Sequence, residues 1–481
     1  MPASLLSHSY QQLGSSPENR ALRSLRSLAT RPAPSAGFRT ISQEGTHVTR
    51  LRTAITPLAL ALVAGLHLMA PSPATAASPA TAPSPGMAAS PAMAPSPGTG
   101  PVFNLPNGTP AQQRAIRSDL LARVKAAAPR STIKVALYHF WDAEVARALA
   151  KAHTSAKRRV NVQVMLDESS VSAMPSSTSY TILRKALGTN RAKRSFVGLC
   201  PKGKSCLGDP GAGPSIAHNK FWLFSRTGRL RNVVVQTSSN LSSGSWTKFW
   251  NDAMVVSQAR TYTAYSRYFD KLAAADWRAW RYTRAGAGPY TGYFFPRPGR
   301  ADTVTAILDN VTCRWKDALG SHRTSVRLAM FKLTRQRVAD KLAALHRQGC
   351  AVDIVYAQTD SEDSTGSPGT WEALHAPGGP AVRCLHYDDD GNSRTSREVL
   401  HSKTLMISGR YAGARNKVVW TGSHNYSGPA LTRNDEALLK VDDDAVHDAY
   451  VRHFHRVRGS ALPGLADDTP SCKGVSPQPE H

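Results

Sequence analysis

The feature that most constrains the fold of this chain is an internal repeat. A His-x-Lys sequence, a Ser-x-Asn sequence and an Asn-Asp pair occur in the first half and return, in the same order, roughly 184 residues later. The first set lies at 218/220, 238/240 and 251/252, and the second at 401/403, 423/425 and 434/435. One short motif recurs easily by chance, whereas three in register indicate a duplicated structural unit.

The residues upstream of each motif set predict alternating strands and helices. In the first half we expect a strand at Ile133–Phe140, a helix at Ala143–His153 and a strand at Val160–Asp167. In the second half the same order returns at Val326–Leu333, Arg337–Gln348 and Ala351–Tyr356. Short β-rich runs alternating with helices are typical of the α/β class. We therefore expect two homologous α/β repeats, each a mixed, mostly parallel sheet flanked by helices.

The N-terminal region differs in composition from the repeats. Arg50 and Arg52, the apolar stretch Ile55–Ala70 and the small-x-small sequence Ala74–Ala76 predict an export signal. The following Pro/Ala/Ser-rich tract cannot bury a core and is typical of a stiff linker. The expected organisation is a disordered segment or over-long gene start at 1–47, a signal peptide at 48–76, a linker at 77–104, a first repeat at 105–290 and a second at 291–481.

Six cysteines fit a secreted protein, because disulfides persist in oxidising compartments. Cys200 and Cys206 would close a short loop and are the pair we expect; the other connectivities stay open. The sequence contains no CxxC pair and no His-rich tract that would indicate a zinc site, so we expect no metal and no cofactor.

The charge is strongly positive, with 60 Lys and Arg against 33 Asp and Glu, or +27 net. Such an excess favours anionic partners, either phospholipid surfaces or nucleic acid. It also serves solubility alone, and composition does not separate these alternatives.

The repeated motifs supply the groups that cleavage of a phosphodiester needs. In a strand, residues i and i+2 face the same side, so each His projects together with its Lys. Negative charge on the phosphate repels nucleophiles, and cations and hydrogen-bond donors offset it. The expected phosphate-binding residues are Lys220, Lys403, Ser238, Ser423, Asn240 and Asn425. A lone strand histidine is more often structural, but this duplicated set favours catalysis.

Two imidazoles provide a nucleophile and an acid, and we expect His218 and His401 in these roles. A nucleophilic histidine needs an acceptor on its other ring nitrogen. Our candidates are Glu436, eleven residues after Asn425, and Asp252, twelve after Asn240, with Asp435 a weaker rival.

These paired motifs, and GSHNYSGPALTRNDEALL above all, resemble the His-Lys-Asp motifs of the phospholipase D superfamily. The resemblance implies a pseudo-two-fold fold whose two motifs meet at one active site. It also implies attack by one histidine, forming a phosphohistidine, and protonation of the leaving alkoxide by the other. Similarity to secreted actinobacterial-type phospholipases assigns His218 as nucleophile and His401 as general acid. The sequence departs from the family pattern at Ser225 and Ser408, where an acid usually follows the Lys by five residues.

The sequence is compatible with three functions. The leading one is a secreted, monomeric phospholipase D that hydrolyses or transfers headgroups at a phospholipid membrane surface. The second is a secreted nuclease acting on nucleic acid, and the third is a non-catalytic protein that binds anionic surfaces. The intact His-Lys-Asn sets argue against the third. The acidic run Asp388–Asp390 would be the place to look if a cation proved necessary.

Overall fold

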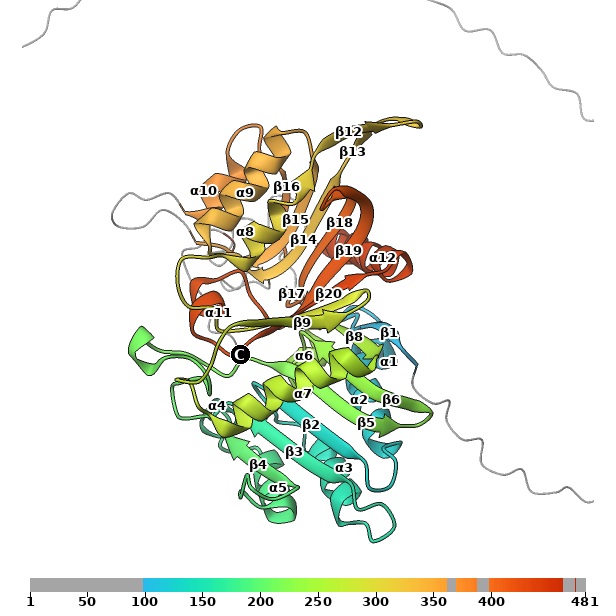
Figure 1. Cartoon of the computed structure of the whole chain (residues 1–481), viewed down its shortest axis with the longest axis vertical. Helices are drawn as coiled ribbons and strands as arrows, with labels where there is room; N and C mark the ends of the chain where they lie inside the picture. Colours follow the sequence, from blue (N-terminus) through green and yellow to red (C-terminus); the bar gives the residue numbers. More distant parts are fainter. Residues whose placement is uncertain (1–97, 361–368, 387–397, 462–471, 473–481) are drawn as a thin grey trace, which may run out of the picture. The chain divides into compact units, whose positions relative to one another are not determined.

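Two mixed β-sheets, one for each repeat, carry the motif residues (Figure 1). The structure is a computed structural model that describes residues 98–360, 369–386, 398–461 and 472. The predicted N-terminal segment, signal peptide, most of the linker and Asp388–Asp390 lie outside the described residues.

The first sheet has the strand order β1-β8-β6-β5-β2-β3-β4. Its strands are β1 (Gly100–Phe103), β2 (Thr132–Leu137), β3 (Asn161–Leu166), β4 (Phe196–Leu199), β5 (Lys220–Thr227), β6 (Leu230–Thr237) and β8 (Asp252–Ser257). The other elements of this half are α1 (Pro110–Gln113), α2 (Ala115–Lys125), α3 (Ala143–Thr154), α4 (Ser169–Ser172), α5 (Ser179–Leu187), α6 (Ser243–Thr247), β7 (Phe249–Trp250) and α7 (Ala259–Ala274).

The second sheet has the strand order β16-β15-β14-β18-β19-β20-β10-β9, which matches that of the first sheet when it is read from the opposite end. Its strands are β9 (Thr283–Ala287), β10 (Tyr290–Phe294), β11 (Val311–Thr312), β14 (Ser325–Lys332), β15 (Ala351–Gln358), β16 (Ala381–Cys384), β18 (Lys403–Tyr411), β19 (Ala414–Gly422) and β20 (Ala437–Asp442). The remaining elements are α8 (Thr303–Leu308), β12 (Arg314–Asp317), β13 (Gly320–Arg323), α9 (Gln336–Arg347), α10 (Thr370–His375), β17 (Val399–Leu400), α11 (Gly428–Thr432) and α12 (Asp444–Ser460). The α/β class and the two repeats are thus confirmed; the pseudo-two-fold packing stays a prediction.

The pairing within the sheets differs from the expectation, because antiparallel pairs predominate. Within the two large sheets of the described residues only β2–β3–β4 and β14–β15–β16 run parallel, and the separate two-stranded β7–β17 pair is parallel as well. The motif strands form tight hairpins instead, and a two-residue connection forces its strands to run antiparallel. In the β18–β19 hairpin the connecting residues Ala412 and Gly413 have φ of 51° and 81°, as the favoured two-residue turns require.

Two segments lie across the predicted domain limits. Gly100–Phe103, inside the expected linker, forms β1 and pairs with β8. The β9–β10 hairpin spans the expected boundary at 290/291 and joins the second sheet through β20. Both are edge additions, for which the local sequence carries no signal beyond short apolar stretches.

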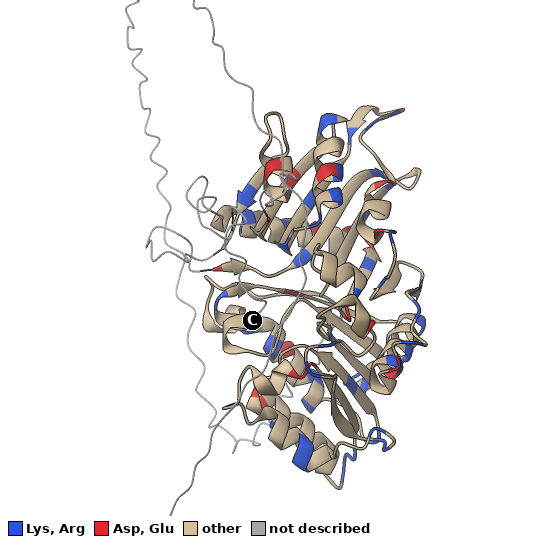
Figure 2. Ribbon diagram, turned by 90° about the vertical axis from the view of Figure 1, so that its left-hand side faces the viewer, with Lys and Arg blue, Asp and Glu red and all other residues tan. Residues whose placement is uncertain are grey.

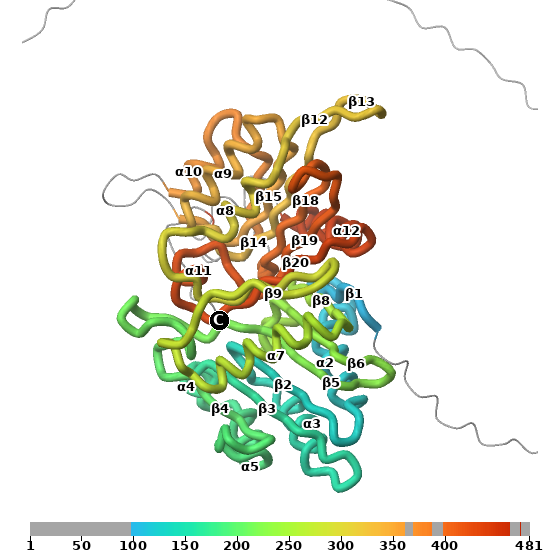
Figure 3. Tube along the Cα trace, in the orientation of Figure 1, coloured from blue at the N-terminus to red at the C-terminus, as the bar shows by residue number. Residues whose placement is uncertain are grey.

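Each sheet packs one face on its own helices and the other on a shared core. Helices α2 and α3 cover the first sheet, and α8 and α9 the second. On α3 the buried residues Val145, Leu149 and Ala152 recur at the spacing of an amphipathic helix. The shared core combines both sheets with α7 of the first repeat and α12 of the second, whose places along the chain Figure 3 shows.

Three disulfides close loops within the halves. Cys200–Cys206 is confirmed, and the other pairs are Cys313–Cys350 and Cys384–Cys472. Within the described residues, no helix combines the length and apolar character needed to cross a bilayer.

Candidate active site

The two His-x-Lys motifs have the same local geometry. Lys220 and Lys403 are the first residues of β5 and β18, and their side chains fold back on the motif backbone. Lys220 Nζ donates to the carbonyl of His218 at 3.0 Å, and Lys403 Nζ to that of His401 at 2.6 Å. All four side chains are buried. Buried ammonium groups are costly, so these lysines imply a site that accommodates negative charge.

An aromatic ring supports each motif, which the sequence reading missed. Tyr138, directly after β2, has its ring 5.1 Å from His218 and 5.2 Å from Lys220 Nζ. Phe331, on β14, lies 4.9 Å from His401 and 4.8 Å from Lys403 Nζ. These cation–π contacts stabilise the buried ammonium groups.

His218 is held by the opposite repeat. Its Nδ1 lies 2.7 Å from Glu436 Oε1, and both side chains are at most 1% exposed. Ser423 Oγ donates to the other carboxylate oxygen of Glu436. Since the carboxylate accepts from Nδ1–H, the lone pair of the imidazole is on Nε2. The predicted pairing of Glu436 with a catalytic histidine agrees with this geometry.

His401 is held in the same way by a residue that the sequence reading missed. Its Nδ1 lies 2.8 Å from Asn251 Oδ1, which also accepts from Ser238 Oγ at 2.9 Å. Asn251 Nδ2 donates to the carbonyl of Ser245, so the amide oxygen faces the imidazole. The signal was present in the sequence, because Asn251 follows Asn240 by eleven residues, as Glu436 follows Asn425.

Asp252, the other residue expected to hold a ring nitrogen of one of the two histidines, contacts other residues. Its Oδ2 accepts from Thr421 and, at 3.0 Å, from the hydroxyl of Tyr450. Burial raises the pKa of this carboxyl group. Asp252 is the first residue of β8 and directly follows Asn251, so its side chain leaves the extended chain on the opposite side. We expected an acid at this place and chose Asp252, whereas the adjacent Asn251 holds His401.

The two motif asparagines follow β6 and β19 at corresponding places. Asn240 Oδ1 accepts a long hydrogen bond of 3.5 Å from the His139 amide, and the next residue, Leu241, bridges to Phe140. Beyond Asn425, the bridge runs from Tyr426 to Leu333. Both asparagines are buried. They lie beside the ends of β2 and β14, the strand ends at which Tyr138 and Phe331 are found. Ser238 and Ser423 donate to the side chains that hold the histidines, and their expected contact with phosphate stays a prediction.

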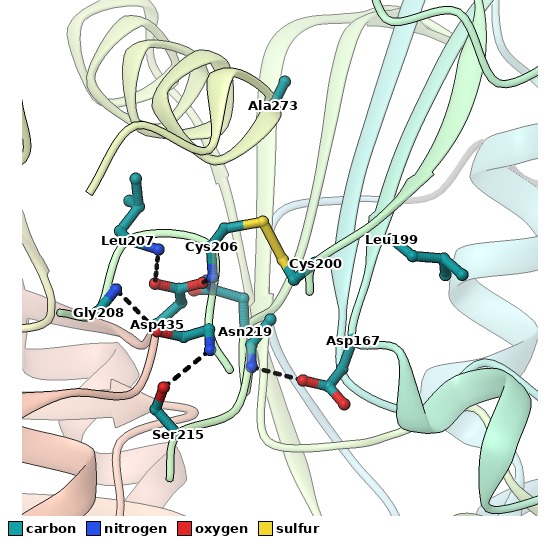
Figure 4. The surroundings of a disulfide bond; sticks show 12 residues. Asp167, Leu199, Cys200, Cys206, Leu207, Gly208, Ser215, Asn219, Ala273 and Asp435 are labelled. Carbon is teal, nitrogen blue, oxygen red and sulfur yellow. Dashed lines mark hydrogen bonds between the residues drawn. A yellow bond between two sulfur atoms is a disulfide. The ribbon is translucent and has the colours of Figure 1, made fainter. Parts of the chain in front are cut away.

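The disulfide loop is hydrogen-bonded to Asp435, the residue before Glu436 (Figure 4). The amides of Cys206 and Leu207 donate to the two carboxylate oxygens of Asp435 at 2.6 and 3.0 Å. The amide of Asp435 donates to the carbonyl of Ile216, just before the first motif. Burial raises the pKa of Asp435 well above its ordinary value. Asp435 therefore connects the loop to the second repeat instead of holding a histidine.

The replacement of the family's usual acid has a structural explanation in the first repeat. Ser225 Oγ accepts from the Thr132 amide at 2.8 Å and ties β5 to β2. Ser408 pairs through its backbone with Ser325, at the matching point of the second sheet.

A cavity of about 510 Å³ adjoins the site and receives residues from both repeats. Tyr138, which contacts His218, lines it together with Ile216 from the first repeat. Lys332 and Arg433 contribute positive charge from the second. In the view of Figure 2, Lys and Arg occur on both repeats, with Asp and Glu between them. The cavity can take an anionic substrate.

The described residues offer one cluster with the composition of a metal site, Cys200, Cys206 and Asp435. Both sulfur atoms are in a disulfide, and the carboxylate is engaged by backbone amides, so the cluster does not suit a cation.

The model of a family described as "Cardiolipin synthase, PLD-like domain" matches residues 120–273 and 316–458, more than half of the chain and one segment in each repeat. The chain belongs to the phospholipase D superfamily. The two matched segments contain His218 and His401, so this superfamily assignment covers both motif sets.

The chain is similar to one curated protein and to several solved structures. Mitochondrial cardiolipin hydrolase of Xenopus laevis is 30% identical over 139 residues, which cover 29% of this chain and 56% of that protein. The match thus spans about half the length of this curated relative. Phosphatidylserine synthase of Haemophilus influenzae has a TM-score of 0.49 and 10% identity, over 74% of this chain and 86% of that one. Yeast tyrosyl-DNA phosphodiesterase has a TM-score of 0.40 and 12% identity, over 71% and 89%.

Proposed function

We propose that this protein is an exported phosphodiesterase that hydrolyses or transfers phospholipid headgroups through a phosphohistidine. One observation carries the proposal: two histidines at the contact of the repeats each have Nδ1 held by an acceptor from the opposite repeat. The Nε2 of each ring is then the nitrogen that acts in the reaction. A charged acceptor at one and a neutral acceptor at the other suit two different roles.

His218 is the nucleophile in this proposal. Its Nε2 lone pair attacks phosphorus, the bond from phosphorus to the headgroup oxygen breaks, and the ring becomes a phosphorylated imidazolium. The Glu436 carboxylate offsets that new positive charge through Nδ1–H, at the 2.7 Å separation of the resting site. A neutral amide stabilises such a cation less, so the pairing favours His218 over His401 for attack.

His401 handles the proton in both half-reactions. Protonated at Nε2, it gives the proton to the leaving alkoxide. It then takes a proton from water or another alcohol, which attacks phosphorus and breaks the bond to His218. Asn251 holds the ring in place through both changes of charge. Lys220 and Lys403 stabilise negative charge on the phosphoryl oxygens.

A phospholipid substrate is supported by the family description and by the curated relative, both of which name cardiolipin. A nuclease is the second candidate, favoured by the net charge of +27. The deciding experiment incubates purified protein with phosphatidylcholine vesicles and, separately, with plasmid DNA, each with and without EDTA. We expect headgroup release, no nicking, and the same rate in EDTA, since lysines and asparagines replace a metal here. Nicking without headgroup release would favour the nuclease.

Export is part of the proposal and rests on the N-terminal sequence and the three disulfides. Mass spectrometry of culture medium should find a mature chain that begins near Ala77. A full-length chain kept in the cells would contradict it.

A further inference from the structure

A second cavity lies away from the histidines. It is a groove of about 590 Å³ between α7 and the β9–β10 hairpin, which lie side by side (Figure 1). This volume is within the range of small-molecule sites. Its lining includes none of the motif residues, so it is a separate feature of the surface.

The floor of the groove is apolar and firmly held. Ala264, Ala285, Trp280 and Phe294 form much of it. Trp280 Nε1 donates to the carbonyl of Pro296 at 2.8 Å, which fixes the indole ring. The floor is therefore shaped before anything binds, which lowers the entropy cost of binding an apolar chain.

The rim is basic. Arg260, Arg267 and Lys271 follow one another on one face of α7, and Arg281 lies opposite. Within the described part of the chain, none of these four forms an ion pair and no acidic side chain lines the groove. The acid nearest along the helix, Asp270, is paired with Lys134. The positive charge of the rim is thus left to an external anion.

We infer that this groove binds one anionic phospholipid, with an acyl chain on the apolar floor and the headgroup phosphate between Arg267 and Lys271. Apolar floor and uncompensated cations together match an amphiphile with a negative headgroup. Nucleic acid would contact the basic rim through its phosphates and would leave the apolar floor uncovered. The choice of a membrane lipid rests on the proposed function, because that function brings the protein to phospholipid surfaces.

The groove is also connected to the catalytic residues through one side chain. Tyr268, which lines the groove, receives a hydrogen bond from Asn219 Nδ2 at 3.0 Å. Its hydroxyl lies 3.0 Å from the carbonyl of Phe295 and 3.2 Å from that of Glu436. Asn219 stands between His218 and Lys220 in the sequence, so one hydrogen bond joins a residue of the groove to the first motif.

The test measures vesicle binding in the His218→Ala background, so that no lipid is consumed. Protein is sedimented with vesicles of phosphatidylcholine alone and with one part in five of phosphatidylglycerol. Arg267→Gln/Lys271→Gln should lower affinity for the anionic vesicles roughly 25-fold, about fivefold per cation. Arg147→Gln/Lys151→Gln on α3 is the matched control, with the same spacing and the same change of charge, and should lower it only slightly.

A second variant tests the apolar floor. Ala264→Trp fills the groove and keeps every cation, so it should lower vesicle binding but leave binding of a single-stranded oligonucleotide unchanged. Thermal melts confirm that each variant is folded. Equal losses from both Gln pairs, or full vesicle binding by Ala264→Trp, would overturn the inference. Loss of oligonucleotide binding alone from the α7 pair would overturn it in favour of a nucleic-acid surface. Because turnover is not measured, these results are independent of the proposed reaction.

Discussion

His401 Nδ1 lies 2.8 Å from the amide oxygen of Asn251, whereas His218 Nδ1 lies 2.7 Å from a carboxylate oxygen of Glu436. The supporting serines, Ser238 and Ser423, occupy matching places. The difference in charge between the two acceptors therefore falls on an otherwise repeated framework. It is the strongest structural reason for different roles of the two histidines.

The first prediction concerns this amide. Asn251→Leu should lower kcat by 10- to 100-fold, as the loss of a residue that orients a catalytic imidazole does. Asn251→Asp should keep activity within about tenfold and move the basic limb of the pH–rate profile upward, because a carboxylate stabilises protonated His401. An unmoved profile in Asn251→Asp would count against a role for His401 as the acid.

The second prediction concerns Asp252. Burial raises the pKa of its carboxyl above the unfolded value, so its favourable contribution to stability is complete at low pH and is lost as pH rises. Asp252→Asn, which cannot ionise, should gain stability relative to the natural chain between pH 4.5 and pH 8. Urea unfolding at both pH values measures this difference. A relative loss of stability at pH 8 would mean that the ionised carboxylate is favoured in the folded chain.

The third prediction compares the effects of removing two different disulfides. Cys200→Ser/Cys206→Ser should reduce the free energy of unfolding by about 2 kcal/mol, the chain-entropy value for so short a loop. It should also lower kcat, because the loop's amides hold Asp435 next to Glu436. Cys313→Ser/Cys350→Ser is the control and should lower stability but not kcat, since Cys313 and Cys350 pack in the second repeat's outer core. Equal kcat values in both variants would remove the link between the loop and the site.

The sequence predicted the repeats, because duplicated motifs at equal spacing constrain the geometry directly. The same motifs indicated both histidines and Glu436, whose roles in catalysis stay predictions. Asn251 was missed for a chemical reason: an acid was sought, and Asp252 stood one residue further. A strand places side chains alternately, so a shift by one residue moves a group off the site. The β9–β10 hairpin was assigned across a boundary because its pairing with β20 is long-range. In the sequence Tyr138 and Phe331 resemble ordinary strand residues, and only the structure places the two lysines over their rings.

The most direct test of the account is the site of phosphorylation. His401→Ala is incubated with a labelled phosphodiester whose leaving group is activated and needs no proton, and the quenched protein is mapped by mass spectrometry. The account predicts label on His218 in this variant and none in His218→Ala, with slow or absent turnover of the ordinary substrate in both. Label on His401 in the His218→Ala variant would contradict the assignment made from Glu436 and Asn251, and full activity of either alanine variant would contradict the mechanism itself.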